Sequence, residues 1–527
     1  MDWARAPHKR EQLVMFPTRL DEVIGPDHTV RLLDAILERV DWSGWEARYD
    51  LTRGQPPIHP RVLCGVILYG LLTRIRSTRG LEEALNVRTD FVWLAEGRSI
   101  DHTTLSKFRI SHAAALKDLF VQVGLIARQM GWLTLHTLAF DGTRIRANNR
   151  RSGTRTPNQL RAMKAQLAAR FDELQEQIAQ ADVREEQLLA EDSVRGAGEE
   201  LVDTARRLAK VDAALAELER LEQAAQPLPK RLPLTDPHSR VTPNKEGGFA
   251  PNYTPLATVD VPSGLIVSAD VIPHTDEDKH LLGAIEDVQQ NFGLAAPPPE
   301  MLADSMMATG ENLAACAERD ITLYSPLPDG PADNPALRED PRVPVAEQDR
   351  DRLPTKTVTS RGTLREQLDK HAFVYDQQQD CYWCPQGQRL SLVSISRETA
   401  GGRSRTRHIY KSDAAACDEC PLRARCLSGN SRRRVIRHEH HESWCIEQRE
   451  LMRTEAARQK YAQRRHPGER PFAVIKEQFG VRQFLTRGLE GVKQEWQWLS
   501  TAFNLKQLIG LIRSGLDPPA ASCATVT

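Results

Sequence analysis

The chain has few cysteines and aromatic residues for its length, and it has no excess of charge of either sign. Nine cysteines among 527 residues are too few for a disulfide framework, which excludes a disulfide-rich secreted scaffold. The longest apolar run, residues 62–72, is too short to cross a bilayer. The first ten residues lack the apolar segment of a signal peptide. We therefore expect a cytoplasmic protein with no membrane partner, long enough to form several domains.

Charge is balanced overall, with 71 basic and 71 acidic residues, but it is segregated along the chain. Acidic residues collect between positions 172 and 200. A neutral total with separate basic patches still permits a DNA-binding surface. Arginines are concentrated in two short segments of the chain. The first segment contains Arg144, Arg146, Arg150, Arg151 and Arg155, and the second contains Arg432, Arg433, Arg434 and Arg437.

Residues 1–132 have the pattern of a helical domain. One helix is expected at 29–40, a strongly apolar helix begins at Pro60, and a third spans 79–86. A last helix begins near Asp101, which can cap it. A short helix of basic character at the end of such a domain fits a DNA-binding helix-turn-helix, and it fits a plain helical bundle equally well. The last helix is expected to bury Leu105, Phe108 and Ile110 and to expose Ser106, Lys107 and Arg109.

Two aspartates each end a short apolar strand. In the segment 133–157 a strand ends at Asp141, before a glycine that allows a tight turn. In the segment 231–326 two strands, a helix and another strand ending at Asp304 are followed by a helix and a strand. This order predicts an α/β domain whose sheet starts antiparallel. Each aspartate is in a place typical of a metal ligand, and equally of an ordinary turn residue.

Residues 158–230 interrupt this domain with two helical patterns. Apolar residues recur at spacings of three and four on both sides of a segment, 191–199, that contains two glycines. This pattern predicts an antiparallel helical hairpin, similar to a two-stranded coiled coil, with its turn in that segment. A spacer or interaction role is expected for it.

Residues 327–450 are predicted to be a linker followed by a cysteine-rich insertion. The part 327–360 is rich in Pro and Asp and is expected to be irregular. Two Cys-x-x-Cys pairs then follow, a pattern that indicates a tetrahedral zinc site in a reducing compartment. The alternative is a set of reduced cysteines without metal. The expected ligands are Cys384, Cys417, Cys420 and Cys426, with Cys381 as a substitute.

Residues 451–512 are predicted to contain two amphipathic helices joined by a basic turn. Glu469 is expected in the first turn of one of them, where the helix dipole favours a carboxylate, and Lys476 follows two turns later. Arg464, Arg465 and Arg470 surround this acid, so an ordinary ion pair is the alternative to a functional role. The tail, 513–527, is expected to be disordered.

Three acids, Asp141, Asp304 and Glu469, stand out by their positions in the predicted elements. Three carboxylates that converge on one point repel one another unless cations neutralise them. Their hard oxygen ligands suit Mg²⁺ or Mn²⁺. A pair of such ions activates the nucleophile and stabilises the leaving oxygen in phosphodiester transfer.

Three stretches carry a resemblance to a known family. They are LAFDGTRIRANNRRSGT around the first acid, MLADSMMATGENL around the second, and YAQRRHPGERPFAVIKEQFGVRQFLTRGLE around the third. The chain resembles bacterial insertion-sequence transposases of the DDE type (Asp-Asp-Glu), whose catalytic core has an RNase H-like fold. HPRVLCGVILYGLL and DHTTLSKFR resemble the helical N-terminal domain of that family, and CPQG and CDECPLRARC resemble an insertion found in one branch.

The resemblance implies the fold and the site. The expected fold is α/β, an RNase H-like mixed sheet with flanking helices, plus an all-α N-terminal domain, an inserted helical hairpin and the cysteine-rich insertion. Asp141, Asp304 and Glu469 would be the catalytic triad holding two Mg²⁺ or Mn²⁺ ions. The expected contacts to DNA phosphates are Tyr461, Arg464 or Arg465, Lys476, Arg144, Arg146, Lys107 and Arg109.

The implied activity is metal-dependent DNA cleavage at the ends of a mobile element, followed by strand transfer. The implied partners are the terminal inverted repeats, the target DNA and at least a second copy of the chain, in the bacterial nucleoid. An inactive transposase-derived DNA-binding protein and a nuclease without strand transfer are the alternatives. Two departures from the family pattern stand near the acids: Met306 and Met307 replace a glycine and an aromatic residue, and Pro467 and Gly468 replace apolar residues.

Overall fold

The computed structural model describes most of the chain. The described residues are 19–49, 56–149, 153–185, 191–244, 247–327, 334–360, 363–400, 403–427, 431–439, 441–515 and 518. Arg150 and Arg151 lie outside them, and so does most of the tail that was expected to be disordered.

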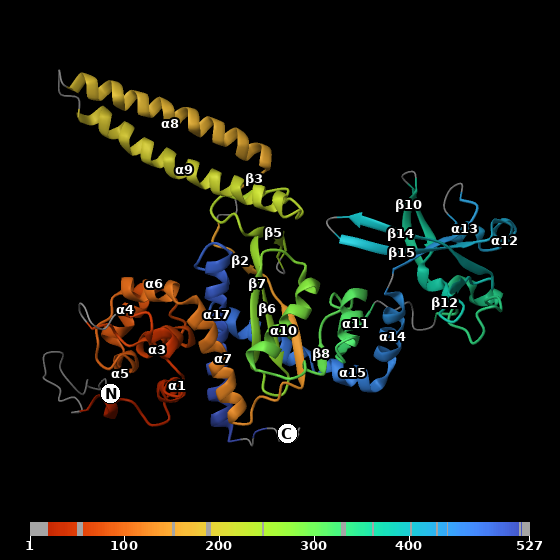
Figure 1. The fold of residues 1–527 in the computed structure, drawn as a ribbon, viewed down its shortest axis with the longest axis horizontal. Helices are drawn as coiled ribbons and strands as arrows, with labels where there is room; N and C mark the ends of the chain where they lie inside the picture. The colour runs from red at the N-terminus through yellow and green to blue at the C-terminus, as the bar shows by residue number, and fades with distance from the viewer. Residues whose placement is uncertain are drawn as a thin grey trace, which may run out of the picture.

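The N-terminal residues form the expected helical domain (Figure 1). Pro60 occupies the first turn of the apolar helix α3, and the Asp101 carboxylate accepts hydrogen bonds from the backbone N–H groups of Thr103 and Thr104 at the start of α6. The 3₁₀ turn η1 (Leu20–Val23) comes first. The helices are α1 (Thr29–Leu37), α2 (Ser43–Glu46), α3 (Pro60–Leu72), α4 (Thr78–Val87), α5 (Thr89–Leu94), α6 (His102–Ser111) and α7 (Ala113–Gln129).

The orientation expected for α6 is wrong at its last turn. Ile110, expected inside, is 64% exposed, whereas Arg109, expected outside, is turned inward. Arg109 donates from Nη1 to the carbonyl oxygen of Arg76, and its own carbonyl accepts from the indole of Trp498. Burial lowers the pKa of the Arg109 guanidinium. The contact between α17 and the last turn of α6 thus decides which face of α6 is buried.

A mixed sheet forms the centre of the molecule. Its long strand β6 runs antiparallel to β7 on one side and to β1 on the other, and β1, β8 and β9 then run parallel. The short strands β2 and β5 pair with the first half of β6. The strands are β1 (Thr137–Gly142), β2 (Ile145–Arg146), β5 (Arg240–Pro243), β6 (Phe249–Asp260), β7 (Ile266–Ile272), β8 (Glu300–Leu302) and β9 (Thr322–Tyr324).

Helices cover this sheet in the order that the sequence predicts. The turn η2 (Glu277–His280) and α10 (Leu281–Asn291) follow β7, and α11 (Gly310–Ala317) connects β8 to β9. The long helix α17 (Leu489–Ser514) packs against β7, α7 and α3. Its Asn504 side chain bonds both the N–H and the carbonyl of Ile266, and its Trp496 indole donates to the Leu256 carbonyl. One continuous hydrophobic core joins the N-terminal helices to the sheet.

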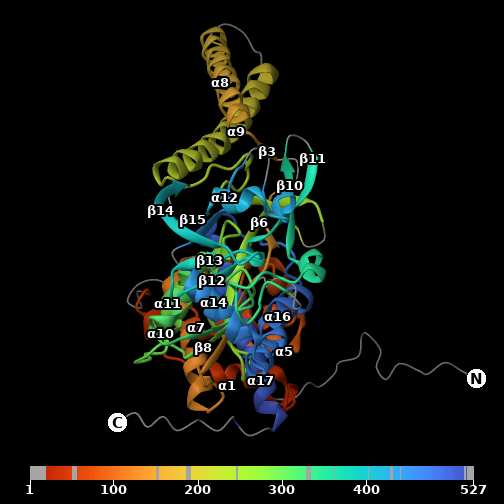
Figure 2. The same cartoon turned by 90° about the vertical axis from the view of Figure 1, so that its right-hand side faces the viewer.

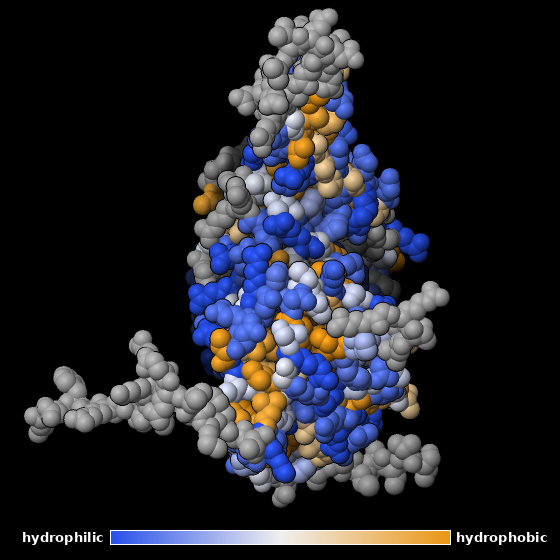
Figure 3. All heavy atoms as spheres, turned by 90° about the vertical axis from the view of Figure 1, so that its left-hand side faces the viewer, coloured by the Kyte–Doolittle hydropathy of each residue, from blue (hydrophilic) through white to orange (hydrophobic). Residues whose placement is uncertain are grey.

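Between β3 (Thr154–Arg155) and β4 (Leu232–Pro233) the chain leaves the sheet domain as a two-helix arm (Figure 2). The arm consists of α8 (Pro157–Glu185) and α9 (Glu191–Gln223), which pack against each other. The antiparallel hairpin is as expected, but residues 191–199, expected to form its turn, lie in α9. Figure 3 shows a face of the molecule that is largely hydrophilic, with apolar side chains in small groups on the arm and below it.

The cysteine-rich segment is a separate β module with its own small core. Its sheet is an antiparallel meander, β12-β13-β14-β15-β16. The linker expected to be irregular contains the turn η3 and the strand β10. The elements are η3 (Glu347–Arg352), β10 (Thr355–Ser360), β11 (Thr363–Leu368), η4 (Lys370–Ala372), β12 (Val374–Asp376), β13 (Cys381–Trp383), β14 (Arg389–Ala400), β15 (Arg403–Ser412), α12 (Ala414–Asp418), α13 (Arg423–Cys426) and β16 (Val435–Glu439).

Three short helices return the chain from this module to the sheet. They are α14 (Glu442–Arg453), α15 (Glu455–Ala462) and α16 (Arg465–Ala473), and a π-helical turn, η5 (Val474–Gln478), continues α16. The Gln448 side chain of α14 donates to the carbonyls of Leu323 and Ser325 at the end of β9. Among the described residues no single helix has the length and apolar composition of a membrane span, although the bent pair α6–α7 would meet that test together.

Candidate active site

Asp141 and Asp304 lie at the carboxyl ends of neighbouring parallel strands. Ala139 of β1 pairs with Leu302 of β8, and each aspartate comes two residues after its member of that pair. Side chains two positions apart in a strand point to the same face, and adjacent strands are about 4.8 Å apart. The sheet therefore brings the two predicted acids to one edge.

Asp141 is held between its own strand and α16. Its Oδ1 accepts from the backbone N–H of Gly142 at 2.8 Å, and its Oδ2 is 3.2 Å from Nη2 of Arg464. Gly468 lies one helical turn after this arginine, where an added Cβ would be 3.8 Å from Oδ2 of Asp141. The small residue at position 468, which departs from the family pattern, thus lets the helix approach the acid closely.

Asp304 begins a tight turn. Its Oδ1 accepts from the N–H of Met306 at 2.9 Å, and its carbonyl oxygen accepts from the N–H of Met307 at 3.0 Å. The side chain of Met306 is 52% exposed, and that of Met307 is buried in the core. The two methionines that depart from the family pattern thus fix the turn through their backbones.

Glu469 lies on the exposed side of α16. The helix begins at Arg465, so this glutamate is beyond the first turn, contrary to the sequence expectation. The opposite side of the helix, with Pro467, Pro471 and Phe472, is buried, and Phe472 stacks on Trp496 with ring centroids 6.0 Å apart. The ion pair expected around Glu469 is formed instead by Arg464 with Asp141.

The three acids are not drawn together into a closed site. In the part of the chain that the structure describes, no group of three or more His, Cys, Asp or Glu side chains is arranged to hold a metal ion. What the fold provides is two aspartates on adjacent strand ends and the helix that carries Glu469 packed against one of them.

Lys476 also reaches this edge of the sheet. It lies in the π-helical turn, and its Nζ donates to Oγ1 of Thr143 at 2.5 Å, two residues after Asp141. Single π turns within α-helices are frequent at functional sites. The structure thus places the predicted lysine beside the first acid.

Glu277 is a residue at this site that the sequence analysis missed. It is buried, and a Cβ added at Gly142 would collide with its Oε2 and lie 2.7 Å from its Cδ. The glycine after Asp141 thus leaves room for a carboxylate from η2, which would have to move if a larger residue stood at position 142. The glycine was the only sign of this contact in the sequence. Local patterns could not identify Glu277, because the contact joins residues far apart in the chain.

The other residues predicted to contact DNA differ from one another in exposure and in hydrogen-bond partners. Tyr461 is half-buried on α15, and Arg465 is exposed on α16. Arg144 donates to the carbonyl of Pro243 at 3.3 Å, and the exposed Arg146 donates to that of Arg482 at 3.4 Å. Lys107 is exposed on α6, far along the chain from the acids.

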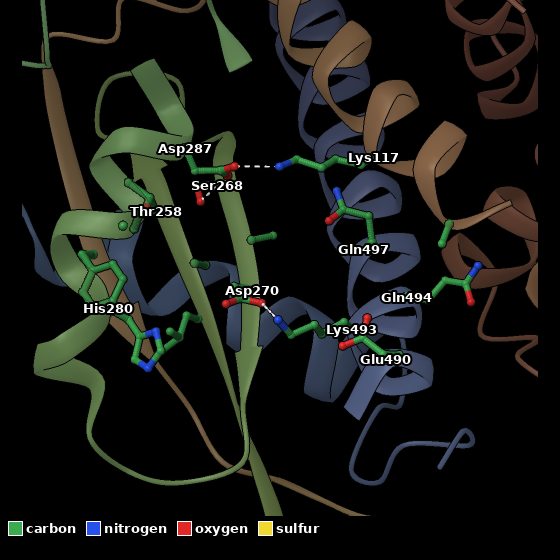
Figure 4. A pocket seen from close by; sticks show the side chains of 17 residues that line it. Lys117, Thr258, Ser268, Asp270, His280, Asp287, Glu490, Lys493, Gln494 and Gln497 are labelled. Atoms are coloured by element: carbon green, nitrogen blue, oxygen red, sulfur yellow. Dashed lines mark hydrogen bonds and ion pairs between the residues drawn. The ribbon is translucent and has the colours of Figure 1, made fainter. Parts of the chain in front are cut away.

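A separate cavity of about 460 Å³ lies between β7, α10 and the helices α7 and α17 (Figure 4). Two ion pairs cross it: Lys117 to Asp287 at 2.8 Å, and Lys493 to Asp270 at 3.0 Å. None of the three predicted acids lines it. The first pair joins α7 to α10 and the second joins α17 to β7, so we interpret the cavity as a gap between packed elements and not as a second active site.

Two family models match the chain. A transposase DDE domain matches residues 383–509, and a transposase domain, DUF772, matches residues 18–111. No curated protein matches. The first match includes Glu469, Lys476 and four cysteines of the β module but not Cys381, and the second covers helices α1 to α6. Asp141 and Asp304 lie between the two matches.

Proposed function

We propose that this chain, for which the two matches support an insertion-sequence transposase of the DDE type, cuts DNA at the ends of its mobile element and joins the cut ends to target DNA. The observation that carries the proposal is the placement of Asp141 and Asp304 on adjacent parallel strand ends, with α16 against Asp141. This edge is where ligands bind in open α/β sheets.

We further propose that the central sheet is an RNase H-like core. Three antiparallel strands, β7, β6 and β1, are followed by two strands parallel to β1. Helices α10 and α11 make the connections. Asp141 lies in the central strand β1, and Asp304 follows the end of its neighbour β8 by two residues. The helical arm and the β module are then insertions into this core.

Asp141, Asp304 and Glu469 are proposed to hold a pair of Mg²⁺ or Mn²⁺ ions. All three supply carboxylate oxygens, the ligands that these hard cations prefer. The Arg464 guanidinium already pairs with Asp141 and would have to give way to an ion bound there. When bound, such ions activate the attacking oxygen and stabilise the leaving oxygen of phosphodiester transfer.

The cationic side chains are proposed to hold DNA. Lys476 and the exposed Arg465 flank the acids and would bind the phosphates next to the cut. Tyr461, Arg144 and Arg146 would extend this surface along the strand. Lys107 on α6 would contact the element end through the N-terminal domain. Because two ends must be brought together, at least a dimer is expected on DNA.

The test is cleavage of a supercoiled plasmid that carries the element ends, in Mg²⁺. We compare the wild type with Asp141→Ala, Asp304→Ala and Glu469→Ala, and with Glu477→Ala as control. Glu477 is exposed and pairs with Arg482 on the surface, close to Glu469 in the chain. Each of the first three variants should lose cleavage and keep end binding, and the control should keep both.

Two results would contradict the proposal. Equal cleavage by all the variants would remove the acids from the mechanism. Tight end binding by the wild type without any Mg²⁺-dependent cleavage would make the chain a DNA-binding protein. Joining of a labelled end to a second plasmid separates strand transfer from simple nuclease activity.

A further inference from the structure

Four cysteines of the β module come together where helices α12 and α13 meet the sheet. Cys384 follows β13, Cys417 lies in α12, Cys420 lies between the two helices, and Cys426 ends α13. Cys384, Cys420 and Cys426 pack at the edge of one small core. The Sγ of Cys417 is 3.1 Å from the hydroxyl of Ser412 at the end of β15. Segments far apart in the sequence thus supply thiols to one region.

Cys384 lies in a turn that is built to hold a thiolate. Its sulfur accepts from the backbone N–H groups of Gln386 and Gln388, both at 3.3 Å. The turn is closed by the Cys384 N–H, which donates to the Gln388 carbonyl, and by Gly387, whose φ is 70°. A Cβ at Gly387 would collide with the Arg342 carbonyl. Two N–H donors aimed at one sulfur favour its negative form.

Cys381 does not share these surroundings. It is fully buried in β13, between Asp376 of β12 and Ser391 of β14. Cys384, Cys420 and Cys426 border the small core of the module, whereas Cys381 is not among the residues that border it. Cys381 is therefore not part of the proposed ligand set, although its spacing from Cys384 in the sequence made it a substitute ligand.

We propose that Cys384, Cys417, Cys420 and Cys426 form a structural zinc site that fastens α12 and α13 to the five-stranded sheet. A set of four thiolates with no open position is the composition of a structural zinc centre. In the described part of the chain the sulfurs are not closed around a point. Zinc would draw the α12–α13 segment onto the Cys384 turn. Because the hydrophobic core of the module is small, a metal link between its segments would add to its stability.

The experiment measures zinc in the purified full-length chain by mass spectrometry and replaces the metal with Co²⁺. One ion per chain is expected, and Co²⁺ should give the absorption bands of a tetrahedral thiolate site. Cys384→Ser, Cys417→Ser, Cys420→Ser and Cys426→Ser should each lose the metal. Cys381→Ser is the matched control and should keep it.

The cobalt spectrum of the wild type keeps the test valid even where a serine variant misfolds, because the band intensity reports the number of sulfur ligands. A wild-type chain that takes up neither metal would overturn the proposal. Loss of metal in Cys381→Ser with retention in Cys384→Ser would overturn the ligand set. These outcomes do not depend on whether the chain cleaves DNA.

Discussion

At the scale of single residues, Gly142 shows how closely the site is packed. In Gly142→Ala the new Cβ meets the Glu277 carboxylate and lies 3.0 Å from Cδ2 of Leu256. We expect a loss of roughly 1–3 kcal/mol of stability, as for other overpacked sites, measured as a lower midpoint of urea unfolding. The double variant Gly142→Ala/Glu277→Ala should recover part of it.

Gly283→Ala serves as the control for this substitution. It lies in α10, and a Cβ there has no other atom within 4 Å. Alanine favours a helix over glycine, so this variant should be neutral or slightly more stable. Equal losses of stability in Gly142→Ala and Gly283→Ala would show that the contact with Glu277 does not cause the loss.

The pairing of Arg464 with Asp141 leads to a second prediction, which depends on the proposed function. In Arg464→Gln the carboxylate loses one cationic partner. The Mg²⁺ concentration for half-maximal cleavage should then fall about fivefold, equivalent to about 1 kcal/mol. Arg465→Gln, next to it and exposed, should leave this midpoint unchanged and reduce the salt dependence of DNA binding. An unchanged Mg²⁺ midpoint in Arg464→Gln would refute competition between this arginine and the metal for Asp141.

At the scale of elements, an ion-pair network anchors the helical arm. Glu217 of α9 is buried and pairs with Arg220 at 2.7 Å and with Arg240 of β5 at 2.6 Å. Burial alone would raise the pKa of Glu217, but the hydrogen bonds from the two arginines lower it. The network is thus stabilising when the carboxylate is ionised.

The stability of the arm is expected to depend on pH because the pKa of Glu217 is lowered in the folded protein. Since the pKa is lower in the folded state, the stabilisation is complete above the ordinary glutamate value of about 4.3 and is lost as the pH falls through the folded-state pKa. Glu217→Gln should cost roughly 1–3 kcal/mol at pH 7 and make the arm easier to cleave with protease. The difference from the wild type should disappear in acid. A pH-independent difference would contradict the role of charge.

The elements also show what the sequence predicted and what it did not. The cap at Asp101, the paired helices of the arm and the strands that lead to the two aspartates follow from local patterns, and they are confirmed. The strand ends differ slightly from the prediction, because β1 continues to Gly142 and β8 ends at Leu302, two residues before Asp304. The inward turn of Arg109 and the contact of Glu277 with Gly142 depend on segments distant in the chain. Whether three acids meet is a through-space property that spacing along the chain cannot establish, and in the structure two of them reach one edge of the sheet while Glu469 lies on the exposed side of α16.

At the scale of the whole molecule, the N-terminal helices and the sheet are one unit. The Arg76 side chain donates to the carbonyls of Gly480 and Gln483 and pairs with Glu495 of α17 at 2.9 Å. Both charged side chains are largely buried, so Arg76→Ala should cost about 3 kcal/mol. Calorimetry should show one unfolding transition for these two parts in the wild type, at a lower temperature in the variant.

Arg39→Ala, on the exposed surface of the same domain, is the control and should change little. A wild-type chain in which the helices melt separately from the sheet would show that the shared core does not couple them. In that case Arg76→Ala would affect only the first transition.

The continuous core has a consequence for shortened forms of the protein. A product that starts after the N-terminal helices would expose the apolar faces of α7 and α17 that those helices cover. Such a product should be removed by cellular proteases before it accumulates. Under the proposed function, a truncated product of this kind would therefore not persist long enough to act as an inhibitor of transposition.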